Sequence, residues 1–307
     1  MNESLAAEKI IDKFFEMLTV DRPYGIEECL SDIETLNHID DMGGLGSTLL
    51  STYVMYKSNS PDEDLDVLKT IISKGANVNH IDGMGNAVIN YAFSAKFMQV
   101  LLDSGADVNF LCYQKRTALF TCRDAEVART LINAGASVNH RDKKGKTPLM
   151  GCASVEVAKV LFDAGADINA KDNDDKTSLM YSHKPGNYQA YRVDMNKFLI
   201  ESGADISAKD NKGNTPLMHA ALMIMEDQEE RVLQVVKYMI EKGADIYSMN
   251  NEGKTVYDQT CEKVSKTKLN RVHACLENYM LLDLANKESS NVNTKLDSYN
   301  KQKKERI

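Results

Sequence analysis

The sequence of 307 residues contains no tryptophan and five prolines, and it lacks the long apolar runs of membrane proteins. No stretch reaches the roughly 20 apolar residues that a membrane-spanning helix needs. The N-terminus has no basic start followed by an apolar core, so we expect no secretory signal. These absences predict a cytoplasmic protein without a membrane span.

The motifs of common enzyme and metal sites are also missing. The sequence has no glycine-rich phosphate loop, no Gly-x-Ser-x-Gly turn and no His-Glu-x-x-His. Its six cysteines include no Cys-x-x-Cys pair and no cluster with histidine, which argues against zinc. His38, His80 and His140 share one repeat position, but the unit between the last two has Phe110 there. We therefore expect no catalytic residues, no metal, no cofactor and no small-molecule substrate.

The balance of charge argues against nucleic acid as a partner. The formal net charge is −8, from 37 Lys and Arg against 45 Asp and Glu, and it opposes binding to phosphates. Acidic residues predominate in residues 1–70, whereas the C-terminal end is mildly basic. No recognition helix or aromatic-basic sheet motif appears.

A short phrase built on glycine, alanine and asparagine recurs along the chain, which indicates a repeat architecture. Its copies are KGANVN at 74–79, SGADVN at 104–109, AGASVN at 134–139, AGADIN at 164–169, SGADIS at 202–207 and KGADIY at 242–247. The glycines are spaced by 30, 30, 30, 38 and 40 residues.

The block 134–169 shows what one unit contains. Thr147 and Pro148 predict a helix start, with threonine as N-cap and proline at the first helical position. A second helix, from Val155 to Phe162, has apolar residues spaced to bury most of its surface. Gly165 ends that helix. One such unit cannot bury its apolar face alone, but stacked units can.

This pattern resembles the ankyrin repeat. The residues that carry the resemblance are Thr147-Pro148-Leu149, Thr215-Pro216-Leu217-Met218-His219-Ala220 and Leu101 to Asn109. The resemblance implies an all-α solenoid of stacked helix-turn-helix units with β-turn fingers along one edge. The family's histidine after Thr-Pro-Leu is replaced in this sequence, and its hydrogen bonds are expected to give way to apolar packing. The replacing residues are Asn90, Phe120, Met150, Met180 and Met218. The central units are also shorter than usual.

Three regions are expected along the chain. Residues 1–36 are predicted to form a helical cap, residues 37–285 an ankyrin domain of about six to seven repeats, and residues 286–307 a disordered tail. Residues 266–284 are predicted to be a long closing helix. The expected repeats are about 37–78, 79–108, 109–138, 139–168, 169–206, 207–246 and 247–285.

Residues at the finger tips change from unit to unit, so the binding surface is expected there. Two neighbouring fingers carry a basic patch, and an inserted loop at 181–192 is rich in tyrosine. A solvated edge and a loop folded back on its own helices are the competing interpretations. The candidate partner-binding residues are Tyr113, Lys115, Arg116, Arg141, Lys143, Lys144, Lys146, Asp174, Asp175, His183, Tyr188, Tyr191, Arg192 and Lys212.

The expected function is a non-enzymatic scaffold that binds a protein partner through its concave and finger surface. One alternative is an inhibitor or immunity-type protein that neutralises an enzyme or toxin. Another is a host-directed effector of a pathogen or virus. The sequence leaves these alternatives open.

Overall fold

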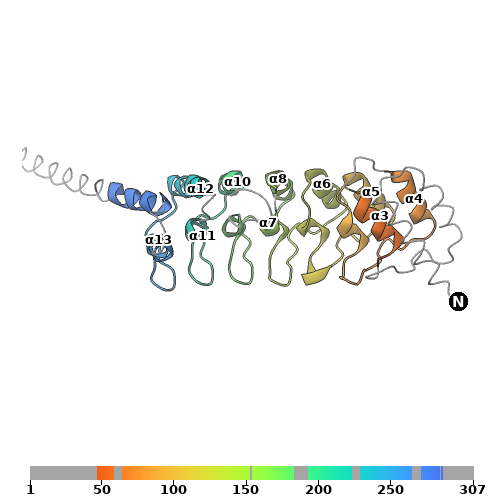
Figure 1. Cartoon of the computed structure of the whole chain (residues 1–307), viewed down its shortest axis with the longest axis horizontal. Helices are drawn as coiled ribbons and strands as arrows, with labels where there is room; N and C mark the ends of the chain where they lie inside the picture. The colour runs from red at the N-terminus through yellow and green to blue at the C-terminus, as the bar shows by residue number, and fades with distance from the viewer. Residues whose placement is uncertain are drawn as a thin grey trace, which may run out of the picture. The chain divides into compact units, whose positions relative to one another are not determined.

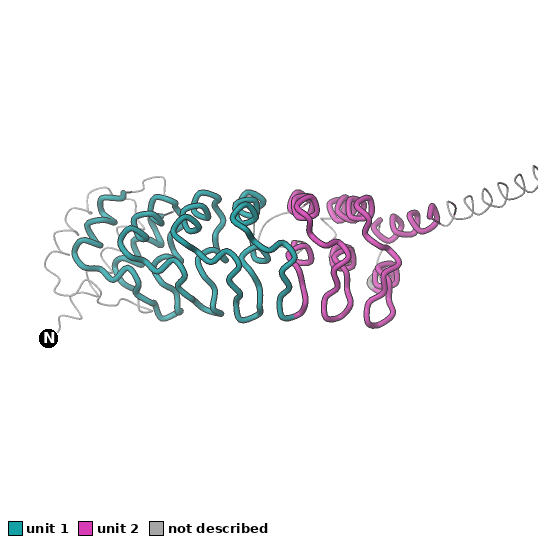
Figure 2. Tube along the Cα trace, turned by 180° about the vertical axis from the view of Figure 1, so that it is seen from behind, with its two compact units in different colours: residues 1–173 teal, residues 174–307 magenta. Residues whose placement is uncertain are grey.

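The computed structural model describes residues 47–58, 64–152, 154–182, 193–222, 229–264, 271–283 and 285. Within these residues the regular structure is helical, with two isolated β-bridges. The chain divides into two compact units, residues 1–173 and 174–307 (Figure 2). The predicted cap at 1–36 and the predicted tail at 286–307 lie outside the described residues. No helix of the described segments is both long and apolar enough to cross a membrane.

Unit 1 consists of inner elements, of which all but the first are single turns, that alternate with outer helices of nine residues (Figure 1). The outer helices are α4 (Leu65–Ser73), α5 (Ala95–Asp103), α6 (Ala125–Asn133) and α8 (Val155–Asp163). The inner elements are α3 (Leu49–Lys57), the 3₁₀ turns η2 (Val88–Tyr91) and η4 (Ala118–Phe120), and α7 (Pro148–Gly151). A further 3₁₀ turn, η3 (Tyr113–Lys115), lies in a finger. Each outer helix packs on the next, in the order α4, α5, α6 and α8.

The outer helices stack because the same three positions of each are buried. In α5 these are Phe97, Met98 and Leu101, and their counterparts recur at 30-residue intervals in α4, α6 and α8. The spacing i, i+1, i+4 places all three side chains on one helical face. Phe162 differs from the prediction, because its side chain is 36% exposed.

The asparagine at the end of each recurring phrase fastens one repeat of unit 1 to the next. Asn109 donates from Nδ2 to the carbonyl oxygen of Gly135 at 3.1 Å and accepts at Oδ1 from the N–H of Ser137 at 2.8 Å. Asn79 and Asn139 make the same pair of bonds with the repeats that follow them. The glycine thus ends a helix, with φ of +88° at Gly165, and also offers its carbonyl to the preceding repeat.

Unit 2 repeats the arrangement, and one of its outer helices is longer, at 13 residues. Its inner helices α9 and α11 contact each other, as do its outer helices α10 and α12, and α11 also packs on α13. Residues 271–283 are helical, which covers most of the closing helix expected at 266–284. The labelled helices are α9 (Ser178–Tyr181), α10 (Val193–Glu201), α11 (Pro216–Leu222), α12 (Glu229–Glu241) and α13 (Val256–Val264).

Three of the threonines that begin inner elements correct one prediction. Thr147 stands at the N-cap of α7, but its side chain makes no capping bond. The reason is that α7 is a single turn, in which the N–H of Met150 is already bonded to the Thr147 carbonyl at 3.1 Å. The Oγ1 atoms of Thr117, Thr147 and Thr177 are buried without a hydrogen-bond partner among the described residues.

These three threonines precede the repeats in which Phe120, Met150 and Met180 replace the family's histidine. The expected loss of hydrogen bonds is therefore seen there. In the repeat with Asn90 the prediction was wrong, because Asn90 Oδ1 accepts from the N–H of Ala87 at 3.0 Å.

The contribution of the unpaired Thr147 hydroxyl to stability can be compared with that of the hydrogen-bonded Thr48 hydroxyl. Replacing a buried hydroxyl that has no partner with a methyl group removes a desolvation cost. Thr147→Val should therefore leave the free energy of unfolding unchanged or raise it slightly, as urea denaturation followed by circular dichroism measures it. Thr48→Val should lower it by about 1 kcal/mol, because Thr48 Oγ1 accepts from the N–H of Ser51 at 3.2 Å. Equal losses in both variants would contradict this account.

Candidate protein-binding surface

Four of the described fingers are tight loops built around one acidic or amide side chain, whereas the finger at 111–116 has Cys112 at that position. In the finger at 141–146, Asp142 Oδ1 accepts hydrogen bonds from the N–H groups of Lys144 at 2.8 Å and Lys146 at 3.0 Å. Asp82 and Asp210 hold the N–H groups two and four residues ahead in the same way. Asn250 does so in the last finger, so an amide oxygen also suffices. These bonds fix the shape of the loop from inside.

Neighbouring fingers within each unit are joined tip to tip through their backbones. In unit 1 the N–H of Lys143 donates to the Gln114 carbonyl at 2.9 Å, and that of Asn173 to the Lys144 carbonyl at 3.0 Å. Gly145 permits this approach, because its φ is +73° and a Cβ there would lie 2.9 Å from the Asn173 nitrogen. In unit 2 the corresponding bonds run from Asn211 to Asp174 and from Asn251 to Lys212, both at 2.9 Å.

The finger tips also carry the unusual backbone conformations of the described residues. Gln114, Lys115 and Asp175 are non-glycine residues with φ near +60°. Such conformations cost of order 1 kcal/mol each and persist where the surroundings hold them in place. For Lys115 the holding contacts include its own N–H bond to the Cys112 carbonyl at 2.9 Å and the bond between its carbonyl and His140 Nε2 at 2.8 Å.

The second oxygen of each finger carboxylate has a different partner in each repeat. Arg116 Nε donates to Asp142 Oδ2 at 3.0 Å, His219 Nε2 lies 2.8 Å from Asp210 Oδ2, and the Tyr91 hydroxyl donates to Asp82. Burial and the bond to Asp82 raise the pKa of Tyr91 to about 12.

The pKa values of Asp142 and Asp210 are instead held below their usual range. Burial alone would raise the pKa of Asp142, but the bonds from the Lys146 N–H, the Arg116 side chain and the Lys144 N–H outweigh burial. Asp210 follows the same pattern, with the Asn214 N–H and His219 as its main opposing donors.

Unit 1 brings seven of the predicted site residues onto two joined fingers. Tyr113 and Lys115 are exposed on one finger, and Arg141, Lys143 and Lys144 on the next. Lys146 is half-buried beside them. Arg116 is directed inward, because it pairs with Asp142 and lies over the ring of Phe120 with 5.9 Å between the guanidinium carbon and the ring centroid. It therefore supports the finger that follows it.

The other predicted residues belong to unit 2 or lie outside the described residues. Asp174, Asp175 and Lys212 are exposed on fingers of unit 2, where Asp174 also pairs with Lys176 at 3.7 Å. The predicted loop residues lie outside the described residues, so their role in an interface stays a prediction. They are His183, Tyr188, Tyr191 and Arg192.

Exposed apolar side chains beside the basic residues were not among the predicted binding residues. Ile81 and Met84 are exposed on the finger at 81–86, and Leu111 on the finger at 111–116. The signal was present in the alignment of repeats, because the later fingers at 141–146 and 171–176 have no large apolar residue.

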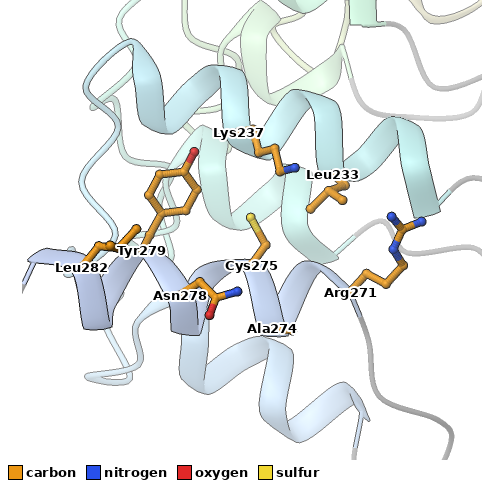
Figure 3. A pocket seen from close by; sticks show the side chains of 8 residues that line it. All are labelled: Leu233, Lys237, Arg271, Ala274, Cys275, Asn278, Tyr279 and Leu282. Carbon is orange, nitrogen blue, oxygen red and sulfur yellow. The ribbon is translucent and has the colours of Figure 1, made fainter.

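A cavity of about 360 Å³ lies in unit 2 between α12 and residues 271–283 (Figure 3). Leu233 and Lys237 of α12 face Cys275 and Tyr279 of the closing helix across it. Arg271 at its rim is engaged by α12, because its N–H donates to Glu229 and its guanidinium to Glu230, both at 2.7 Å.

Three cysteines of the described residues have thiols that burial keeps protonated, which disfavours a role as nucleophile. Burial raises the pKa of Cys112 and Cys275, and it raises that of Cys122 to about 11. Cys261 differs, because its sulfur lies 3.6 Å from Nε2 of His273, a pair that the sequence did not suggest. No group of three metal-ligating side chains is present among the described residues.

Comparison with known proteins identifies the class. A family model described as three copies of the ankyrin repeat matches residues 90–172, 123–210 and 149–250. These matches together span more than half of the sequence, and the chain belongs to the ankyrin-repeat family. The predicted all-α ankyrin fold is thereby confirmed.

A solved structure extends the comparison to the whole fold. The ankyrin repeat domain of Bcl-3, described as a unique member of the IkappaB protein family, matches with a TM-score of 0.55. The match covers 76% of this chain and 99% of that domain, and at 19% sequence identity it shows the fold alone. No curated protein matches the sequence significantly.

The depressed pKa of Asp142 predicts a pH dependence of stability. A carboxyl whose folded pKa lies below its unfolded value of about 3.9 adds stability above that value and loses it as pH falls through the folded pKa. Asp142→Asn keeps an acceptor for the loop but removes the charge that Arg116 neutralises. We expect it to lower the free energy of unfolding by about 1 kcal/mol at pH 7 and by less at pH 3.

Urea denaturation of the wild type and of Asp142→Asn at both pH values measures this difference. Asn250→Asp is the matched control. It makes the reverse change, from amide to carboxylate, at the equivalent position of the last finger. A loss in Asp142→Asn that is as large at pH 3 as at pH 7 would show that the charge of Asp142 is not what stabilises the finger.

Proposed function

We propose that this protein binds a protein partner through the joined fingers of unit 1, by docking an acidic surface of the partner onto their basic residues. Ankyrin repeats are protein-interaction modules, and their fold is typically a non-enzymatic scaffold. The observation that supports the site is the contrast between Arg116 and its neighbours. Arg116 is paired with a buried carboxylate, whereas no ion pair within the described residues engages Lys143, Lys144 or Arg141.

The backbone that carries these cations supports the same proposal. Lys143 and Lys144 lie on a loop whose amides are bonded to Asp142 and to Gln114. A partner that docks there would order two side chains but little backbone, and the entropy lost on binding would be correspondingly smaller. Whether the partner is an enzyme or toxin that the protein inhibits, or a host protein, stays a prediction.

Charge reversal at the basic finger tests the proposed site. The partner is captured from native cells with the wild type, purified, and then titrated against variants by surface plasmon resonance. The double variant Lys143→Glu/Lys144→Glu should weaken binding by about tenfold or more, because it places like charges against an acidic surface. The far-ultraviolet circular dichroism spectrum should be unchanged.

The control reverses two exposed lysines on outer helices of the same unit, Lys69→Glu/Lys159→Glu. It changes the net charge equally and should leave the affinity within about twofold at 0.15 M salt. Equal weakening in both double variants would indicate a general charge effect. Undiminished binding by Lys143→Glu/Lys144→Glu would exclude the basic finger as the docking site.

A further inference from the structure

Large apolar side chains are exposed on the two fingers that precede the basic finger. We name the fingers at 81–86 and 111–116 the apolar fingers, and the finger at 141–146 the basic finger. Ile81, Met84, Leu111 and Tyr113 are between 46% and 69% exposed on the apolar fingers. The basic finger carries no large apolar residue. An apolar patch bordered by charge is typical of an interaction surface.

A cavity of about 600 Å³ lies at the base of the apolar fingers. Asn86 and Cys112 line it from the fingers, and Ile89 and Ala118 line it from η2 and η4. Phe93 and Thr121 line it from the connections that follow these turns, together with the charged residues Arg123 and Asp124. The turns η2 and η4, which contribute Ile89 and Ala118 to its lining, are both 3₁₀ in geometry. A cavity of this volume accommodates a large side chain. Phe93 and Thr121 are exposed at its rim.

A hydrogen-bond donor in the wall of this cavity has no partner. Asn90 uses its Oδ1 atom to accept from Ala87, and its Nδ2 atom is buried without an acceptor among the described residues. An unsatisfied buried donor costs about 1–3 kcal/mol and is rare in native proteins. Asn90 therefore leaves one donor unused beside the cavity.

The basic finger stands one repeat away from this cavity. The bond between the Lys143 N–H and the Gln114 carbonyl fixes its position beside the second apolar finger. Neighbouring elements of a stack are roughly 10 Å apart, and an extended chain covers that distance with about three residues at ~3.3 Å each. A segment anchored in the cavity would therefore bring a residue about three positions away to Lys143 and Lys144.

We propose that the cavity and the apolar fingers hold a large apolar side chain of an extended acidic partner segment, while an acidic residue about three positions away contacts the basic finger. The segment must carry an acidic residue, because the exposed Lys143 and Lys144 would contact it. It must also carry an apolar residue, because the cavity and four exposed apolar side chains lie on the two fingers and repeats that precede the basic finger. This inference rests on the proposed function and names the chemistry of the partner at that site.

The test uses a displayed library of random twelve-residue peptides selected against the full chain. We expect the enriched peptides to share a large apolar residue and an aspartate or glutamate three or four positions apart. The best peptide is then labelled with fluorescein and titrated by fluorescence polarisation. Thr121→Phe, which fills the cavity, and Phe93→Ala, which removes its rim, should each weaken binding at least about tenfold. Lys143→Glu/Lys144→Glu should do the same.

Matched controls and thermal melts separate the outcomes. Phe162→Ala removes an aromatic side chain of similar exposure from α8 and should bind like the wild type. Phe93→Ala keeps the test valid if Thr121→Phe fails to fold. Enrichment of peptides without the paired apolar and acidic residues would overturn the inference. So would unchanged binding by both cavity variants. If only Lys143→Glu/Lys144→Glu loses binding, the inference fails and the proposed function stands. If no variant loses binding, both fail.

Discussion

The buried carboxylate of Asp142, at the base of the basic finger, is the interaction on which the binding surface of this protein depends. Asp142 accepts two backbone N–H groups through one oxygen and the Arg116 side chain through the other. The loop therefore closes into one shape, in which Gly145 leaves room for Asn173 and Lys143 reaches the carbonyl of Gln114. The exposed Lys143 and Lys144 therefore lie on a loop whose backbone is fixed by hydrogen bonds to Asp142 and Gln114, so the proposed binding residues are on an ordered loop.

The rest of the framework works through contacts between neighbours. The asparagines Asn79, Asn109 and Asn139 each bond to the repeat that follows, and the outer helices stack by the same three buried positions. Because these framework contacts are the same from repeat to repeat, they do not distinguish one repeat from another. Distinct chemistry arises where repeats depart from one another: the apolar fingers, the basic finger, and the cavity at the base of the apolar fingers.

The sequence predicts the framework well, because every repeat imposes the same requirements at the same positions. Gly165 and the buried positions that α8 shares with the other outer helices are examples. It predicts the surface less well. Arg116 looks like Lys115 in sequence, but the carboxylate that engages Arg116 is 26 residues away in the next finger. The cavity near Asn90 was also not foreseen, because residues of two different repeats line it together.

The central claim is that the fingers of unit 1 are ordered before any partner binds. Amide hydrogen exchange of the free protein, resolved by residue, tests it most directly. The amides of Lys143, Lys144 and Lys146 should exchange at least about tenfold more slowly than in an unstructured chain, because each is bonded to Gln114 or Asp142. Exchange of these three amides at unstructured rates would show that the fingers are not preformed.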